Sequence, residues 1–340
     1  MLIRSRVPLR ISFAGGGTDV SPYSELKGGV AVNTTIDKYA TVSLYPTEDR
    51  RIEIQSIDYD ITVSYDIDKF LAYDGHLDLV KGVINHFRAH YELPGGFKLR
   101  VQNDAPPGSG LGSSSAVCVA LVGAFQRWLN LPLTPYDVAE IAYVIERKEL
   151  LINGGKQDQY AAAFGGFNFM EFYKDKTIVN PLRLRSEIVY ELHHSLVLAY
   201  VGGSHNSSEI LAEQKRNMGL SDSQVLTALD DIKESALRMK DFLVTGKLGK
   251  FGKLLDNTWK LKKSLATGIT NEKIDAIYCT AISAGALGGK ISGAGGGGYM
   301  FFFVDVDRKY SVIKALEETG VQLVNYSFTD DGLHTWEVRS

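Results

Sequence analysis

The chain has 340 residues, 44% of them hydrophobic and 23% charged, a balance typical of a globular protein with a substantial core. Its net charge of −3 offers no positive excess for nucleic acid or an acidic membrane surface, so we expect neither as a partner. No apolar run approaches the ~18 residues of a transmembrane helix, and the arginine-bearing N-terminus lacks the apolar core of a signal peptide.

The cysteine content indicates the compartment. Cys118 and Cys279 are the two cysteines, and both lie in apolar runs with helical spacing. This placement favours buried free thiols over a disulfide, which suits a reducing environment. We therefore expect a cytoplasmic protein.

The first predicted elements are strands. Apolar and polar residues alternate from 7 to 13, which predicts a strand with Arg10 on its polar face. Pro8 favours an edge or the start of that strand, and the glycines at 15–17 end it. Further strands are predicted at 39–45, 52–57 and 97–101, and a helix at 77–87.

Residues 106–116, Pro-Pro-Gly-Ser-Gly-Leu-Gly-Ser-Ser-Ser-Ala, are the most informative segment. Alternate glycines allow a tight loop whose backbone N–H groups approach a ligand, and the helical spacing after it places a helix N-terminus there. There is no Walker A ending, and Ser113 stands where a dinucleotide fingerprint needs glycine. The alternative is a strand-to-helix turn capped by serines. The predicted phosphate-binding residues are Pro107, Gly108, Ser109, Gly110, Leu111, Gly112, Ser113, Ser114 and Ser115, of which Ser113 or Ser114 could also bind Mg²⁺.

The next helix has a clear start, because Thr134 can cap it and Pro135 fits its first position. Its apolar stripe leads to Glu146, which by itself reads as a solvated surface residue. After a glycine break, residues 157–164 form a short helix in which Asp158 is as suited to a helix cap as to catalysis. An aromatic strand is predicted at 167–173.

A polar stretch at 174–191 indicates a domain boundary, so we predict two α+β domains at 1–185 and 186–340. The second half has strands at 196–201 and 299–304 and a glycine-rich segment at 293–298. That segment matches Gly-x-Gly-x-x-Gly, but a strand follows it, so it is not a dinucleotide site. Gly293, Gly295 and Gly296 form either a flexible β-turn or a second backbone wall around phosphates. Helices are predicted near 207–217, 222–244, 247–265, 270–285 and 308–319, with two short strands at the end.

Three segments in this order, 6–19, 106–116 and 290–298, resemble the three motifs of the GHMP small-molecule kinases, the group of galactokinase, homoserine kinase, mevalonate kinase and phosphomevalonate kinase. The Ala-Gly-Gly-Gly-Thr-Asp start and the run at 157–172 are most similar to bacterial D-glycero-D-manno-heptose 7-phosphate kinases, with L-fucose kinases nearby. The resemblance implies an N-terminal domain like ribosomal protein S5 domain 2, a ferredoxin-like C-terminal domain and a site between them.

The resemblance also implies residue roles, with ATP and Mg²⁺ as cofactors. Asp158 matches the catalytic Asp that takes or orients the substrate hydroxyl proton, and Arg10 matches the basic residue that pairs with it. Ser113 and Glu146 match magnesium ligands, and Asp19 matches a carboxylate that binds sugar hydroxyls. The predicted substrate-binding residues are Gly16, Gly17, Thr18, Asp19 and Lys156.

One departure bears on the substrate. Galactokinases carry Glu and His where this chain has Gly16 and Gly17, so galactose contacts are lost and a larger or differently shaped sugar is favoured. A sugar phosphate would also need cations, for which Lys156, Lys262 and Lys263 are candidates. We expect a sugar kinase, monomeric or homodimeric, that phosphorylates the anomeric hydroxyl of D-glycero-D-manno-heptose 7-phosphate. The alternatives are a kinase for fucose or another free sugar, and a sensor that binds ATP and sugar without chemistry.

Overall fold

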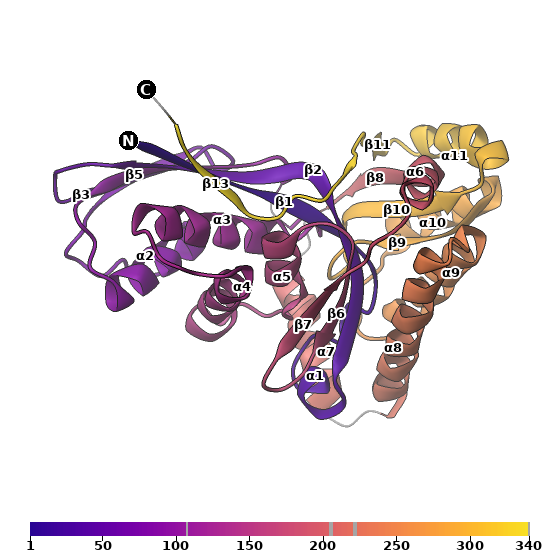
Figure 1. The fold of residues 1–340 in the computed structure, drawn as a ribbon. Helices are drawn as coiled ribbons and strands as arrows, with labels where there is room; N and C mark the ends of the chain where they lie inside the picture. Colours follow the sequence, from indigo (N-terminus) through magenta and orange to yellow (C-terminus); the bar gives the residue numbers. More distant parts are fainter. Residues whose placement is uncertain (107, 204–206, 220–222, 339–340) are drawn as a thin grey trace.

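The computed structural model describes residues 1–106, 108–203, 207–219 and 223–338, and it divides into two lobes (Figure 1). A long ribbon of β1 (Leu2–Ala14) and β2 (Gly29–Pro46) runs through the N-terminal lobe, paired from Ile3↔Leu44 to Ala14↔Val32. The predicted strand at 7–13 is confirmed. Pro8 is not at the start of this strand, because β1 continues through it. Pairing with β13 ends at Arg6, so β1 pairs with β2 alone at Pro8, which fits the predicted edge position.

The N-terminal lobe is a sheet with helices packed on it. In the described residues the sheet has nine strands, six of them in the order β13-β1-β2-β5-β3-β4, while β6 and β12 both pair with β2. The remaining elements of this lobe are α1 (Tyr23–Lys27), β3 (Arg51–Ser56), β4 (Ile61–Asp66), α2 (Asp78–His90), β5 (Phe97–Asn103), α3 (Ser113–Trp128), α4 (Pro135–Tyr143), a π-helix (Val144–Glu149), α5 (Gln157–Phe164), β6 (Asn168–Phe172) and β7 (Thr177–Pro181).

The C-terminal lobe has the βαββαβ arrangement of a ferredoxin-like domain. Its antiparallel sheet has the order β11-β8-β10-β9, in which the first and third strands of the motif are central. The predicted helices of this half are confirmed with shifts of one or two residues at most ends. The elements are α6 (Ser186–Ser195), β8 (Leu196–Gly202), α7 (Ser207–Gly219), α8 (Ser223–Val244), α9 (Leu248–Lys263), α10 (Glu272–Ala284), β9 (Ala286–Ile291), β10 (Gly298–Val304), α11 (Val306–Glu318) and β11 (Gln322–Leu323).

The end of the chain returns to the N-terminal lobe. There β12 (Phe328–Thr329) pairs with β2 and β13 (His334–Val338) pairs with β1, so both termini lie side by side (Figure 1). The predicted division at 186 placed these residues in the C-terminal domain. Their backbone hydrogen bonds are instead satisfied by the edge of the N-terminal sheet, which the β13 strand covers.

The two lobes share a hydrophobic core beneath the site. The ring of Phe13 on β1 lies 5.3 Å from that of Phe251 on α9 and 5.8 Å from that of Phe301 on β10. Because all three are fully buried, the strands and helices that carry the site residues are packed against one another across the lobe boundary.

The two cysteines differ in exposure. Cys118 is buried in α3 as predicted, whereas Cys279 is exposed on α10, and both are free thiols. The prediction for Cys279 failed because its helix turns the opposite face, with Ile274 and Ile277, toward the core.

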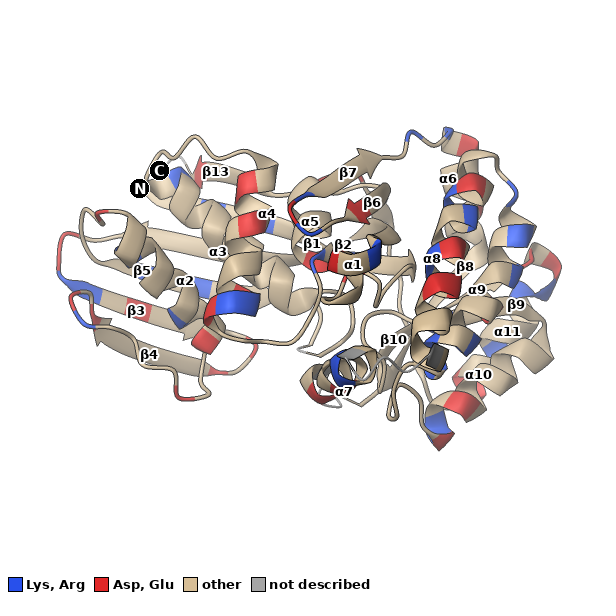
Figure 2. Cartoon of the chain, turned by 90° about the horizontal axis from the view of Figure 1, so that it is seen from below, with Lys and Arg blue, Asp and Glu red and all other residues tan. Residues whose placement is uncertain are grey.

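Charged side chains of both signs are interspersed over the helices of the C-terminal lobe (Figure 2). No helix in the described part of the chain is long and apolar enough to cross a membrane.

Candidate active site

Two glycine loops form one wall of a cavity between the lobes. Gly110 and Gly112 have φ of +81° and +72°, and α3 begins immediately afterwards at Ser113. An ideal Cβ on Gly110 would lie 2.1 Å from the Ser292 carbonyl oxygen, and one on Gly293 would lie 2.6 Å from the Gly110 Cα. The predicted phosphate loop and the third glycine motif therefore contact each other backbone to backbone, which only glycine permits.

The hairpin between β9 and β10 thus combines both interpretations of the third motif, since it is a turn that also lines the cavity through Gly293 and Ala294. Gly295 and Gly296 do not line that cavity. The Gly296 N–H donates to the Ile269 carbonyl at 2.9 Å, and an ideal Cβ on Gly295 would lie 2.8 Å from Ile269. These two glycines let the turn pack on the C-terminal lobe.

The predicted residues of the first loop also divide by role. The cavity is lined by Gly108, Gly110, Gly112 and the consecutive serines 113–115, while Leu111 is fully buried in the core. The backbone of Ser109 is engaged by the third motif, because its carbonyl accepts the Tyr299 N–H at 2.9 Å. Pro107 lies outside the described residues.

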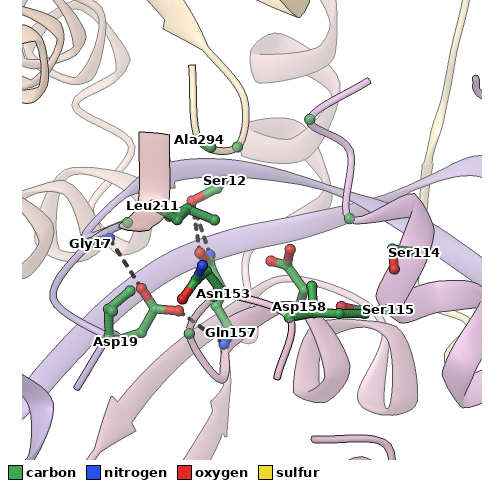
Figure 3. A pocket seen from close by; sticks show the side chains of 18 of the residues that line it. Ser12, Gly17, Asp19, Ser114, Ser115, Asn153, Gln157, Asp158, Leu211 and Ala294 are labelled. Carbon is green, nitrogen blue, oxygen red and sulfur yellow. Dashed lines mark hydrogen bonds between the residues drawn. The ribbon is translucent and has the colours of Figure 1, made fainter. Parts of the chain in front are cut away.

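Arg10 and Asp158 form an ion pair at the centre of the site. Asp158 lies in the first turn of α5, and its Oδ1 accepts from Arg10 Nε at 2.8 Å and lies 2.6 Å from Nη2. Arg10 on β1 is 4% exposed and also donates to the Gly110 carbonyl at 2.5 Å. Arg10 therefore connects the carboxylate to the phosphate loop, and Figure 3 shows that the Asp158 carboxylate points into the cavity.

Glu146 is fully buried, contrary to the expectation of a surface residue. The helix changes from α to π geometry at Val144, and the wider turn places Glu146 against α3 and α5. Its Oε1 accepts from Ser114 Oγ at 2.9 Å and its Oε2 from Gln159 Nε2 at 2.5 Å. The hydroxyl that contacts Glu146 thus belongs to Ser114, whereas the predicted magnesium ligand was Ser113. Successive helical residues point about 100° apart, so only one can face Glu146.

The loop after β1 supplies a second carboxylate. Asp19 is buried, and its two oxygens accept the N–H groups of Gly17 at 3.0 Å and Gln157 at 3.1 Å (Figure 3). Burial, followed by the charge of Asp158, raises the pKa of Asp19. An ideal Cβ on Gly155 would lie 2.0 Å from Asp19 Oδ2, so this glycine is required, a role that the sequence analysis missed.

The predicted substrate residues are not all in the cavity. Gly16, Gly17 and Asp19 line it. Thr18 is fully buried, and its hydroxyl holds the loop together through the Gly15 and Val30 carbonyls, each at 2.8 Å. Lys156 lies in an adjoining cavity, with Nζ 5.0 Å from the centre of the Tyr143 ring.

A further cavity adjoins the predicted phosphate loop, and Asp158 is not among the residues that line it. It shares Gly108, Ser113 and Ser114 with the main cavity, and its other lining comes mostly from the β3–β4 turn and the start of α2. These segments could not be identified from the sequence, because their residues carry no recognisable motif and meet only in the fold.

Comparisons with known proteins identify the family of the chain. Residues 78–166 match the family model of the GHMP kinases N terminal domain, and residues 239–322 match that of the GHMP kinases C terminal. The chain is 42% identical to a D-glycero-alpha-D-manno-heptose 7-phosphate kinase from Campylobacter jejuni, over 99% of both proteins.

Solved structures are similar over the same length. A structure titled D-glycero-D-manno-heptose 1-phosphate kinase, from Bacteroides thetaiotaomicron, is 41% identical, with a TM-score of 0.84 over 99% of this chain and 100% of that one. A galactokinase from Lactococcus lactis, 21% identical over 98% of this chain and 95% of its own, shares the fold with a TM-score of 0.78. The chain therefore belongs to the GHMP kinases, as a phosphotransferase that acts on a sugar.

Proposed function

We propose that this protein transfers the γ-phosphoryl group of ATP to the anomeric hydroxyl of D-glycero-D-manno-heptose 7-phosphate, giving the 1,7-bisphosphate and ADP. The observation that carries the proposal is the Arg10–Asp158 pair, which faces a cavity bounded by two glycine loops and by the open Gly16–Gly17 turn. The similarity to the heptose kinases supports the choice of sugar. We place the reaction in the cytoplasm, where its product would supply nucleotide-activated heptose for surface polysaccharide.

The residues present suit ATP. Loop glycines that admit no Cβ and the first N–H groups of α3 offer backbone donors to phosphate oxygens, and the positive end of the helix favours their charge. The cavity that adjoins the loop is placed to hold the nucleoside.

The residues present also suit Mg²⁺. Ser114 and Glu146 offer a hydroxyl and a carboxylate, the oxygen ligands that this ion takes. Among the described residues no group of three His, Cys, Asp or Glu could hold a metal by itself, which fits an ion that arrives with the nucleotide. When bound, Mg²⁺ would neutralise charge on the phosphates.

The chain's own residues then position the reaction. Asp158 accepts a hydrogen bond from the sugar hydroxyl and aligns its oxygen with the γ-phosphorus, while Arg10 holds the carboxylate in place through two close contacts. The new O–P bond forms as the bond from phosphorus to the β–γ bridging oxygen breaks. ADP leaves with that electron pair, and the hydroxyl proton passes toward Asp158. Positioning and charge stabilisation are what phosphoryl transfer chiefly requires.

The test is ADP release with ATP and Mg²⁺ across D-glycero-D-manno-heptose 7-phosphate, the unphosphorylated heptose, mannose 6-phosphate, fucose, galactose and mevalonate. We expect a strong preference for the heptose 7-phosphate, with phosphorus NMR of the product identifying the anomeric position. Activity only on an unphosphorylated sugar would overturn the substrate while leaving the mechanism. Bound ATP with no turnover on any compound would contradict the proposed reaction.

The magnesium assignment makes a separate prediction. Ser114→Ala removes the hydroxyl that contacts Glu146, so we expect the Mg²⁺ concentration for half-maximal rate to rise roughly 10-fold or more. Titration of activity with Mg²⁺ at saturating ATP measures it. Ser113→Ala is the comparison, and we expect a smaller shift from it. The reverse order of the two shifts would return the ligand role to Ser113.

A further inference from the structure

A lysine of the C-terminal lobe reaches into the cavity beside the catalytic pair. Lys262 lies in the last turn of α9, is only 6% exposed, and lines the cavity together with Arg10, Asp19 and Asp158. Its Nζ donates to the Gly293 carbonyl of the third glycine motif. Among the described residues this is its one hydrogen bond, and no carboxylate oxygen there lies within ion-pairing distance.

The surroundings of Lys262 hold other charged groups but give it no carboxylate partner. Arg10 is a neighbouring cation, and Asp158 is already paired with it. The buried Lys290, whose Nζ donates to the Ser12 carbonyl at 2.7 Å, has its pKa lowered well below the ordinary value by burial and by the charges of Lys262 and Arg10. Burial, followed by the charge of Arg10, lowers the pKa of Lys262 to about 8, although Asp19 and Asp158 act in the opposite sense. A buried ammonium group without a carboxylate partner is costly in the free protein, and an incoming anion would relieve that cost.

The glycine turn leaves the ammonium accessible. An ideal Cβ on Gly16 would lie 3.8 Å from Lys262 Nζ and 3.7 Å from Ser12 Oγ. A longer side chain at position 16 would therefore occupy the space into which Nζ points. With glycine there, Lys262 faces the same cavity as the Asp158 carboxylate.

We propose that Lys262 binds a phosphate oxyanion that enters this cleft with the substrates. The phosphate is either that of the sugar phosphate or the phosphoryl group in transfer from ATP; only the first source rests on the proposed heptose 7-phosphate specificity. In both cases the ammonium group supplies charge-assisted hydrogen bonds that no neighbouring carboxylate competes for. Lys262 is thus a binding residue of the C-terminal lobe for a reaction whose catalytic pair lies in the N-terminal lobe.

The test is Lys262→Met, which keeps an unbranched side chain only one atom shorter and removes the charge. If the sugar phosphate is the ligand, KM for D-glycero-D-manno-heptose 7-phosphate rises roughly 10- to 100-fold and the preference over the unphosphorylated heptose disappears. If the phosphoryl group in transfer is the ligand, kcat falls by a similar factor on both sugars with little change in KM. Lys262→Arg, which retains the charge, recovers part of the loss in either case.

A binding measurement separates this proposal from the choice of sugar. With ADP and Mg²⁺ saturating the glycine loop, inorganic phosphate should raise the melting temperature of the wild type more than that of Lys262→Met. Lys260→Met is the matched control, since Lys260 lies on the same helix but is 65% exposed and pairs with Asp256. Equal phosphate effects on wild type and Lys262→Met, together with unchanged kinetics, would overturn the proposal even if another sugar proves to be the substrate.

The pH dependence of stability gives a readout that a structural lysine would not. The pKa of Lys262 is about 8 in the folded protein, and its ordinary value is 10.5. As the pH rises, the folded protein therefore loses the Lys262 proton before the unfolded chain does. Between these two pH values the unfolded chain binds more protons, so stability increases with pH. Stability of the wild type relative to Lys262→Met should therefore rise from pH 7.5 to 9.5. The charged groups that face position 262 are Arg10, Asp19, Asp158 and Lys290 in both proteins. Because the charge of Lys262 also lowers the pKa of Lys290, the difference between wild type and variant reports Lys262 together with its effect on Lys290. The opposite result would be a wild type that is more stable than Lys262→Met at pH 7.5 and loses this advantage at higher pH. It would show that the charged ammonium group is stabilised by a partner within the protein, and it would overturn the proposal.

Discussion

Asp158→Asn should reduce kcat by roughly 100- to 10,000-fold, the range that a positioned acid–base group contributes. The amide keeps the shape and one acceptor oxygen, so Arg10 retains a hydrogen-bond partner, but the negative charge that orients and receives the hydroxyl proton is lost. ATP binding should change little, because the phosphates contact the glycine loops. Steady-state kinetics on the sugar substrate and calorimetric titration with ATP measure the two quantities.

A second arginine–aspartate pair, whose arginine also lies on β1, supplies the control. Arg6 on β1 contacts Asp331 at 3.4 Å, and both side chains are largely exposed. Exposed pairs contribute about 0–1 kcal/mol to stability, so Asp331→Asn should leave both kcat and the melting temperature nearly unchanged. Near-normal turnover in Asp158→Asn, beside an unaffected Asp331→Asn, would contradict the catalytic assignment.

Gly110→Ala should destroy the nucleotide site and destabilise the protein by about 2–5 kcal/mol. Its Cβ would lie 2.1 Å from the Ser292 carbonyl oxygen, and φ of +81° is unfavourable for alanine. The two glycine loops would have to separate, which also breaks the hydrogen bond from Arg10 to the Gly110 carbonyl. Thermal unfolding and ATP titration should both report the change.

Gly320→Ala distinguishes the clash from the backbone strain. Gly320 has φ of +77°, but no atom lies within 4 Å of an ideal Cβ, and it is remote from the cavity. We expect a cost of about 1–2 kcal/mol from the left-handed conformation alone, with normal ATP binding. If Gly110→Ala were no more harmful than Gly320→Ala, the backbone contact between the loops would not matter.

Elements with strong local signals were predictable. The capping box of Thr134 and Asp137 is present at the start of α4, and α5 begins and ends at the predicted residues. The long amphipathic helices α8 and α9 were also found, because a buried stripe repeats over several turns. The strands β4 and β7 and the helix α6 were missed. The sequence of β4, Ile-Thr-Val-Ser-Tyr-Asp, does alternate apolar and polar residues as a strand should, so this strand was open to prediction. The short β7 and α6 lie within the polar stretch that was interpreted as a domain boundary.

Interactions between distant segments were beyond local reasoning. No periodicity signals that residues 328–338 return to the first sheet, because that choice depends on strands β1 and β2, whose paired residues lie 292 to 336 positions earlier in the chain. The π-helix that buries Glu146 could not be predicted from local spacing either, because the apolar stripe before it has the ordinary spacing of an α-helix. For that reason the local pattern alone favoured a surface carboxylate, whereas the family resemblance predicted a magnesium ligand.

By itself the sequence determined the family and the α+β fold class, and it predicted a phosphate loop and a catalytic role for Arg10 and Asp158, two residues that the structure brings into an ion pair. These conclusions depend on short motifs whose glycine, serine and carboxylate spacing is dictated by local backbone geometry. Only the tertiary structure decided that Ser114 faces Glu146, that Thr18 supports its loop, that Lys156 lies in a separate cavity and that Lys262 enters the site. The direction of a side chain depends on which elements pack against its own, and that packing is settled by burial across the whole chain.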